Sequence, residues 1–276
     1  MKKIILTLIV LLTALMLFAG GAKEEVKTIS VISREDGSGT RGAFTELVGL
    51  LDKNKVDQTT VNAEIANSTS VVITTVAGNK NSIGYISLGS LNDSVKAVKV
   101  NGVEPTQANI ENGSYKLQRP FNIAYKALTP VAEDFLSFIF SDQGQAIVEK
   151  KGYIKVAANG AYEAKNISGK LTISGSSSVY PLMEKLVEAY KALNPQLDIS
   201  LQQSDSTTGV KDVINGVSDI GMASRDLKAS EKEAGVSNRV IAVDGIAVIV
   251  NKENAASDLS LDEIKAIYLG NETSWK

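Results

Sequence analysis

The order of hydrophobic and polar positions predicts strands that alternate with helices along most of the chain. Short β-branched or apolar runs are typical of buried strands, whereas apolar residues three and four apart are typical of helices. The predicted strands span residues 28–33, 83–88, 95–100, 121–125, 170–173, 197–202, 219–223 and 240–250, with a break at 244–245. The predicted helices span residues 41–51, 71–77, 131–150, 181–193, 210–215 and 261–269, with a short helix or turn at 105–112. This alternation predicts an α/β architecture with mostly parallel sheets.

Four short segments rich in small polar residues follow predicted strands, at residues 34–41, 174–178, 205–209 and 224–225. In α/β sheets, ligands bind beyond the carboxyl ends of strands, where helices begin. Backbone N–H groups and hydroxyls at such positions attract an anion, and the helix dipole adds to this attraction. Arg34 can contribute a planar fork of donors that matches a tetrahedral oxyanion.

Each segment also has a purely structural interpretation, because Ser and Asp are favoured residues for capping a helix. One hydroxyl is enough for a cap, whereas residues 174–178 contain four serines around a glycine. The four segments together therefore favour one anion-binding site over four unrelated caps.

The composition favours a binding protein over an enzyme or a nucleic-acid-binding protein. The 276 residues suffice for two modest domains or one large one, and a net charge of -2 with 5% aromatic residues argues against nucleic-acid binding. The chain contains neither His nor Cys, which excludes a Ser-His-Asp triad, a Cys-His pair, an HExxH metal motif and disulfides. No spacing suggests a carboxylate metal site or Ser-Lys chemistry. We therefore expect a binding protein, not an enzyme, without a metal or organic cofactor.

The N-terminus has the pattern of a secretory signal at residues 1–22. Lys2 and Lys3 precede an uncharged run at residues 4–19, which ends in small residues and then a charged stretch. Cleavage is expected between residues 18 and 23, although an uncleaved anchor is an alternative; the run is short for a membrane span of roughly 20 residues. Because Cys is absent, a Cys-linked lipid anchor is excluded, and we expect an exported protein at the periplasmic or extracellular face of the membrane.

Several segments resemble the phosphate-binding proteins of bacterial phosphate ABC importers, and the resemblance covers nearly everything after the signal except residues 157–168. They are SREDGSGTRGAFTELV, IGYISLGSL, FLSFIFSDQGQAIVEKKGYI, GKLTISGSSSVYPLMEKLVEAY, SDSTTGVKDVINGVSDIGMASRDL, AVDGIAVIVN and LDEIKAIYLGNETSW. The resemblance implies a periplasmic-binding-protein fold with two α/β lobes and a hinge between them, which closes over phosphate.

The resemblance also implies which residues bind the anion. One lobe would supply Ser177, Ser178, Ser206 and Ser224, and the other Arg34, Ser38, Gly39 and Thr40. Asp36 would hold Arg34 in place, and Asp205 would be a second supporting carboxylate. Better-known family members have an Asp that accepts a ligand proton at the position matching Ser224. This leaves the proton acceptor open among Asp205, Asp36 and Asp226.

The order of the segments differs from that of the family and is the order of a circular permutant. The segment with Ser177 comes first in the family, and the GNETSW segment leads into SREDGSGTR, which here follows the signal instead. Residues 157–168 would be the linker that joins the family's usual C- and N-termini. One lobe would then consist of residues 26–116 with 245–276 and the other of residues 117–244, with crossovers near 116–120 and 244–246 and Gly245 as a hinge residue.

The implied function is a monomeric receptor that captures inorganic phosphate and delivers it to the membrane permease of an ABC importer. Because residue 224 is Ser, a receptor for sulfate, molybdate or another tetrahedral anion is an alternative. A phosphate-ester hydrolase acting through Ser or Thr is a third interpretation, disfavoured by the absence of His and Cys. A permuted chain that folds poorly and has lost its function is the fourth.

Overall fold

The computed structural model describes residues 28–275. The predicted secretory signal at residues 1–22 lies outside the described residues. Within the described part of the chain, no helix is both long and apolar enough to cross a membrane. All the predicted binding residues fall inside this part.

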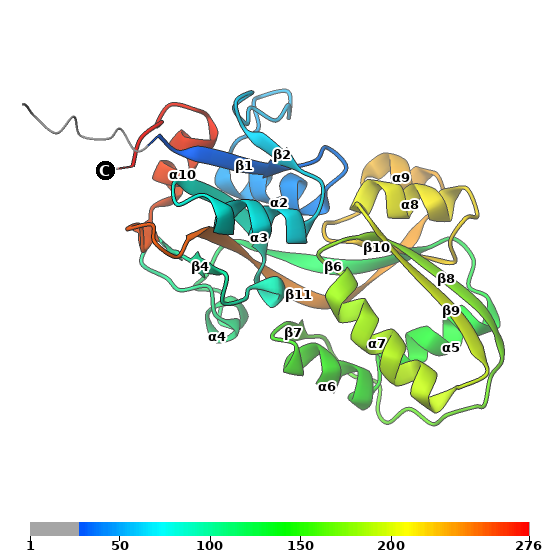
Figure 1. The fold of residues 1–276 in the computed structure, drawn as a ribbon. Helices are drawn as coiled ribbons and strands as arrows, with labels where there is room; N and C mark the ends of the chain where they lie inside the picture. Colours follow the sequence, from blue (N-terminus) through cyan, green and yellow to red (C-terminus); the bar gives the residue numbers. More distant parts are fainter. Residues whose placement is uncertain (1–27, 276) are drawn as a thin grey trace, which may run out of the picture.

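The strands form one long mixed sheet in which two parallel groups are joined by antiparallel strands (Figure 1). The parallel groups are β2 (Glu64–Ala66), β1 (Ser30–Arg34) and β3 (Ser82–Ser87), and β10 (Ile220–Ala223), β8 (Gly169–Ser176) and β9 (Leu197–Ser204). Between them lie β11 (Ser237–Asn251) and β6 (Gln118–Tyr125), antiparallel to each other and to β3 and β10. Smaller pairings involve β4 (Val95–Ala97) and β7 (Ile154–Lys155) on β11, and β5 (Lys99–Val100) on β12 (Asp258–Leu259). The sheet is thus mixed, not mostly parallel, because β6 and β11 cross between the two groups.

The strand β11 continues through the predicted break at residues 244–245, so that prediction is wrong. Asp244 lies opposite Arg119 of β6 and Gly245 opposite Gln118. The Asp244 carboxylate and the Arg119 guanidinium form a buried ion pair of 3.1 Å. A polar residue that would interrupt an isolated apolar strand is therefore accommodated by a partner on the neighbouring strand.

Helices cover both faces of the sheet around β11, which explains the apolar run in its second half. Ile246 and Val248 pack in a cluster with residues of α2 (Gly39–Val48) and α10 (Leu261–Tyr268). Ala247 and Ile249 pack with residues of α3 (Thr69–Gly78). Alternate residues of a strand point to opposite faces, so a strand covered on both sides needs apolar side chains at every position.

The other parallel group has its own hydrophobic cluster, formed with α5 (Pro130–Ile139), α6 (Asp142–Lys150) and α7 (Tyr180–Leu193). The helix predicted at residues 131–150 is divided between α5 and α6. Ser141 causes the division, since its Oγ accepts from the Gly144 N–H and donates to the Phe138 carbonyl. The remaining helices are α4 (Gln107–Glu111), α8 (Ser206–Ile214), α9 (Ala229–Glu233) and the 3-10 turn η1 (Leu88–Ser90).

Residues 157–168 contain no helix or strand, as their polar and aperiodic sequence predicts, yet they are tied to the core. Tyr162 is buried and its hydroxyl donates to Asp134 at 2.7 Å. The Asn159 N–H donates to the Phe140 carbonyl at 2.8 Å. This segment therefore runs along the surface of α5 in a defined path.

Candidate functional site

Arg34 and the start of α2 are placed by the turn that follows β1. Arg34 is the last residue of β1, and Ser38 caps α2 by accepting the Arg41 N–H on its Oγ at 3.3 Å. The backbone N–H of Arg34 donates to the Tyr85 hydroxyl at 3.1 Å. Burial raises the pKa of Tyr85, so its hydroxyl keeps its proton beside Ser33. The backbone at the end of β1 is thus held by Tyr85, independently of the contacts of the Arg34 side chain.

The predicted serines come from the second parallel group. Ser177 and Ser178 lie between β8 and α7, and Ser224 follows β10. Ser206 is the first residue of α8, and the capping residue Asp205 accepts from the Thr208 N–H at 2.9 Å. The carboxyl ends of β8, β9 and β10 therefore bring these serines to one edge of the sheet.

Residues of both groups meet in one buried set of hydroxyls around Arg34. We call it the hydroxyl cluster, and its members are Arg34, Thr40, Thr69, Ser176, Ser177, Ser178, Ser206 and Ser224, each at most 4% exposed. Thr40 Oγ1 lies 2.8 Å from Ser178 Oγ, and the Arg34 Nη2 donates to Ser177 Oγ at 3.0 Å. Ser224 Oγ lies 3.0 Å from Ser176 Oγ and 3.3 Å from Ser206 Oγ.

Two glycines allow the turn before α2 to lie against α8. A Cβ on Gly39 would overlap the hydroxyls of Ser206 and Ser224, and one on Gly37 would overlap the Asp205 carboxylate. The backbone N–H and the Oγ1 of Thr207 both donate to the Gly37 carbonyl at 3.1 Å. The absence of a side chain at these positions is what brings the two groups of strands into contact at the hydroxyl cluster.

Arg34 is held by Glu35 and not by Asp36, so the prediction for Asp36 is wrong. The Arg34 Nε and Nη2 donate to the two Glu35 carboxylate oxygens at 2.7 and 2.6 Å. Asp36 lies in the exposed turn between β1 and α2, where its side chain is 98% exposed and accepts from Arg41 Nη1 at 2.8 Å. The turn directs Asp36 towards solvent, whereas Glu35 lies alongside the guanidinium.

The carboxylates considered as proton acceptors have their interactions outside the hydroxyl cluster. Asp36 binds Arg41, and Asp226 is exposed. Asp205 accepts from the backbone and the hydroxyl of Thr208. The geometry thus favours none of the three for that role.

Ser224 is followed by Arg225, whose guanidinium turns away to Glu231 at 2.7 and 2.8 Å. Burial alone would raise the pKa of Glu231, but the hydrogen bonds from Arg225 and from the Lys228 N–H lower it below its ordinary value. This ion pair keeps the Arg225 charge paired beside the cluster, and Arg225 Nη2 also donates to Thr207 Oγ1 at 3.2 Å.

Two members of the hydroxyl cluster, Ser176 and Thr69, were not named as binding residues from the sequence. Ser176 lies inside the identified segment at residues 174–178, whereas Thr69 lies in none of the four segments. Thr69 begins α3, and its Oγ1 lies 3.1 Å from Ser178 Oγ. The polar run Asn-Ser-Thr-Ser at residues 67–70 was a usable indication, because it opens a predicted helix. The preceding strand β2 has only three residues, two of them exposed, so the strand–turn–helix pattern of the other segments was not visible there.

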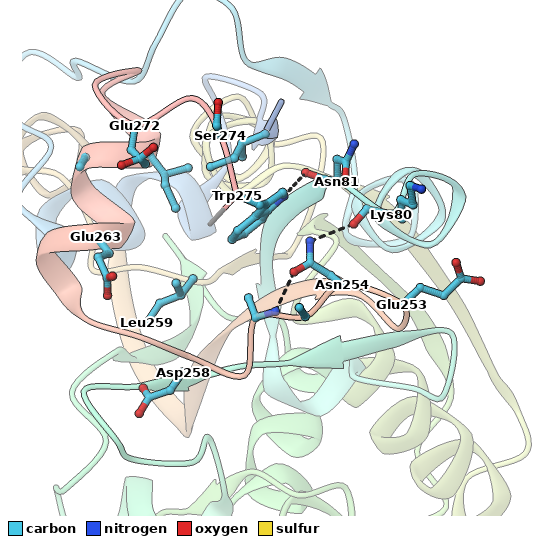
Figure 2. Close-up of a pocket in the computed structure, with 15 residues that line it drawn as sticks. Lys80, Asn81, Glu253, Asn254, Asp258, Leu259, Glu263, Glu272, Ser274 and Trp275 are labelled. Atoms are coloured by element: carbon cyan, nitrogen blue, oxygen red, sulfur yellow. Dashed lines mark hydrogen bonds between the residues drawn. The ribbon is translucent and has the colours of Figure 1, made fainter. Parts of the chain in front are cut away.

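A separate cavity of about 480 Å³ lies beside α10 and the C-terminal segment (Figure 2). Its lining includes the carboxylates Glu253, Asp258, Glu263 and Glu272, and one lysine, Lys80. It shares no residue with the hydroxyl cluster. Because its carboxylates outnumber its cation, this cavity repels an anion, and we assign the anion site to the hydroxyl cluster instead.

Comparisons with known proteins identify the family and the fold of this chain. A family model described as a PBP superfamily domain matches residues 22–143 and 160–276. A protein named phosphate-binding protein PstS 2 from Streptococcus agalactiae is 52% identical over 254 residues, which are 90% of this chain and 87% of that protein. This chain belongs to the PstS family of the PBP superfamily.

A crystal structure from Streptococcus pneumoniae, described as a phosphate-binding protein of a phosphate ABC transporter, matches this PstS-family chain with a TM-score of 0.71. The two are 47% identical, and the match covers 90% of this chain and 98% of the other. The PstS of Bacillus subtilis is 36% identical over 126 residues, 44% of this chain and 41% of its own length. The predicted family and the α/β periplasmic-binding-protein fold are thereby confirmed.

Proposed function

We propose that this protein is an exported receptor that binds inorganic phosphate at the hydroxyl cluster and delivers it to the permease of an ABC importer. The observation that carries the proposal is a buried guanidinium that contacts a cluster of hydroxyls from five separate segments. A hydrogen bond to a charged group contributes about 1.5–3 kcal/mol. Micromolar affinity needs about 8 kcal/mol, so eight to twelve such bonds leave a surplus over ordering and desolvation. The names of the streptococcal relatives support phosphate as the ligand.

The binding residues we propose are those that the family resemblance implies. They are Arg34, Ser38, Gly39, Thr40, Ser177, Ser178, Ser206 and Ser224. Glu35 positions Arg34, and Asp205 supports the site by capping α8. In this proposal Arg34 supplies the positive charge and the backbone at Gly39 supplies N–H donors at the start of α2.

A second candidate ligand is another tetrahedral oxyanion such as sulfate. The observation in its favour is that the nearby carboxylates Asp36 and Asp205 have partners outside the cluster. A carboxylate accepting the ligand's proton would reject sulfate, since sulfate carries no proton at neutral pH. Competition between phosphate and sulfate, measured by calorimetry at several pH values, separates the two ligands.

Isothermal titration of the wild-type protein with phosphate tests the proposed function. We expect Arg34→Ala to abolish measurable binding, at least a thousand-fold or about 4 kcal/mol, because the anion then lacks its buried cation. Lys211→Ala, which removes an exposed cation from α8, is the matched control and should bind as the wild type does. Absence of heat with wild-type protein would refute phosphate binding, and wild-type affinity in Arg34→Ala would refute the site.

We also propose that the molecule consists of the two predicted lobes, residues 26–116 with 245–276 and residues 117–244. The pairing of Arg119 with Asp244 and of Gln118 with Gly245 supports crossovers at residues 116–120 and 244–246. Contacts of Thr207 with Gly37 and of Thr40 with Ser178 would then form between lobes as they close over the anion.

The permuted chain order is a further part of the proposal. A permuted chain aligns along its whole length with relatives of the same order, and over one part at a time with relatives of the other order. The streptococcal match over 90% of the chain, the Bacillus subtilis match over 44% and the two separate family-model segments fit this expectation. We propose that the order is natural and is shared with the streptococcal proteins.

For its cellular context, we propose that residues 1–22 direct export and that the receptor acts as a monomer outside the cell membrane. A folded binding protein with one site between two lobes needs no second copy to complete that site. Its partner in this proposal is the membrane permease that accepts the released anion.

A further inference from the structure

The start of α3 contributes Thr69 to the region around Arg34. Ser68 caps this helix by accepting the Val71 N–H on its Oγ at 3.3 Å. Thr69 takes no part in the cap, and both its N–H and its hydroxyl contact Ser177. The Thr69 N–H donates to Ser177 Oγ at 3.3 Å. The side chain is only 4% exposed, so its polar atoms need partners inside the protein.

Thr69 Oγ1 connects the arginine with the serines that precede α7. It accepts from Arg34 Nη1 at 3.3 Å and lies 3.3 Å from Ser177 Oγ and 3.1 Å from Ser178 Oγ. The two distances to serine hydroxyls exceed the usual 2.7–2.8 Å between hydroxyl oxygens that share a hydrogen bond. Thr69 is therefore buried among strong donors but held only loosely by them.

The polar groups of Thr69 and the side chains that contact it can all donate hydrogen bonds. Arg34 and the Thr69 N–H donate only, and each hydroxyl carries a hydrogen of its own as well as lone pairs. An acceptor-only group such as a tetrahedral oxyanion would take up these donors with shorter, charge-assisted bonds. The donors around Thr69 thus converge as a ligand of that class requires.

We infer that Thr69 is a further ligand of the bound anion, donating from its hydroxyl and from its backbone N–H. This inference rests on the proposed function and adds a ligand to it from an element, α3, that supplies none of the other proposed binding residues. Together with Arg34 and Thr40 it forms the side of the site that faces Ser177 and Ser178.

Calorimetric titration with inorganic phosphate of three variants tests the inference. Thr69→Val removes the hydroxyl and keeps the shape of the side chain, and we expect its Kd to rise at least tenfold. Thr69→Ser retains the hydroxyl and should recover most of the affinity, with a Kd between those of the wild type and the Val variant. Thr74→Val, on the exposed side of the same helix, is the matched control and should bind as the wild type does.

Thermal melts without phosphate check that each variant is folded. Wild-type affinity in a folded Thr69→Val variant would overturn the inference and leave the proposed function intact, whereas absence of binding by the wild type would refute the proposed function. If Thr69→Val does not fold, the crystal structure of the wild-type phosphate complex decides. A Thr69 Oγ1 within hydrogen-bond distance of a phosphate oxygen supports the inference, and a Thr69 out of reach of the ligand overturns it.

Discussion

Arg34 is a buried cation whose charge is shared between Glu35 and the hydroxyl cluster. Its guanidinium makes two short bonds to Glu35 and further bonds to Ser177 and Thr69. A buried charge without a partner is costly, so Glu35 is needed to keep Arg34 in place before an anion arrives. The donors that Arg34 does not give to Glu35 go to Ser177 and Thr69, on the side where we propose that the ligand binds.

Glu35→Gln should lower the free energy of unfolding without phosphate by about 2 kcal/mol, because a charge-assisted bond to a buried cation is lost. Asp36→Asn, at the exposed neighbouring position, should change it by less than about 0.5 kcal/mol. Chemical denaturation of both variants measures the difference. A larger loss in Asp36→Asn than in Glu35→Gln would contradict the assignment of Glu35 as the partner of Arg34.

Asp244 is a second buried charge, at the point where β11 crosses between the two groups of strands. Burial raises its pKa to about 6, against the opposing effects of Arg119 and the Ser87 hydroxyl. Because the folded-state pKa is raised above the ordinary value of 3.8, the folded protein holds this proton more tightly than the unfolded chain does. The contribution of Asp244 to stability is therefore most favourable below pH 4 and is lost as the pH rises through 6.

Between pH 5 and pH 7, the wild type should lose about 1 kcal/mol more stability than Asp244→Asn, in which this group cannot titrate. Carboxylates with lowered pKa, such as Asp57 and Glu231, contribute in the opposite direction but equally in both proteins. Denaturation of both proteins at several pH values gives the two slopes. Parallel slopes would show that the pKa of Asp244 is not raised by burial.

The helix α8 is placed on the sheet by three glycines. A Cβ on Gly209 would lie 2.6 Å from the Gly175 Cα, and one on Gly221 would lie 2.6 Å from the Gly209 carbonyl oxygen. Gly175 also has a φ of 128°, a conformation that residues with a side chain rarely adopt. This close approach sets the position of Ser206 at the start of the helix, over the ends of β8 and β10.

Gly209→Ala should push α8 away from the sheet, lowering the free energy of unfolding by about 2 kcal/mol and weakening phosphate binding through Ser206. Gly78→Ala, at the end of α3, has nothing within 4 Å of the added Cβ and should leave both properties unchanged or slightly improve stability. Thermal melts and phosphate titration provide the two measurements. Equal effects of the two substitutions would contradict the close packing of α8.

The two ends of the described chain lie side by side. Thr28 and Ser274 form an antiparallel bridge, and the Ile29 N–H donates to the Thr273 carbonyl at 2.8 Å. The segment at residues 157–168 lies at the surface and has no regular structure. Adjacent ends and an exposed irregular segment are the conditions under which a chain tolerates a change of order.

A rearranged chain that begins at Asn166, ends at Lys165 and joins residue 276 to residue 28 through a short Gly-Ser linker tests this. Since the same strands and helices then pack in the same way, its phosphate Kd should stay within about threefold of the wild type. A second rearrangement opened between Asp244 and Gly245 is the control, and it should fail to fold because it cuts β11 at its crossover. Loss of cooperative folding in the first chain would mean that the present chain order is required.

Several local features could be predicted because short-range chemistry determines them. The capping residues Ser38 and Asp205 act as their neighbours suggest, and the apolar pattern identified α7, α10 and most strands. The division of residues 131–150 into two helices was missed because apolar periodicity outweighed the capping signal at Ser141. The break expected at residues 244–245 was wrong because the partner Arg119 is distant in sequence.

The amino-acid sequence specified the α/β class, the family and the segments that carry the anion-binding chemistry, since strand patterns, caps and donor-rich turns depend on residues close together in the chain. Three features required the folded molecule. The mixed sheet joined by β6 and β11, the pairing of Arg34 with Glu35, and the entry of Thr69 into the hydroxyl cluster all depend on contacts set by strand pairing and packing. Thr69 and Ser177 are separated by 108 positions and meet through two hydrogen bonds, because the two parallel groups bring their strand ends together.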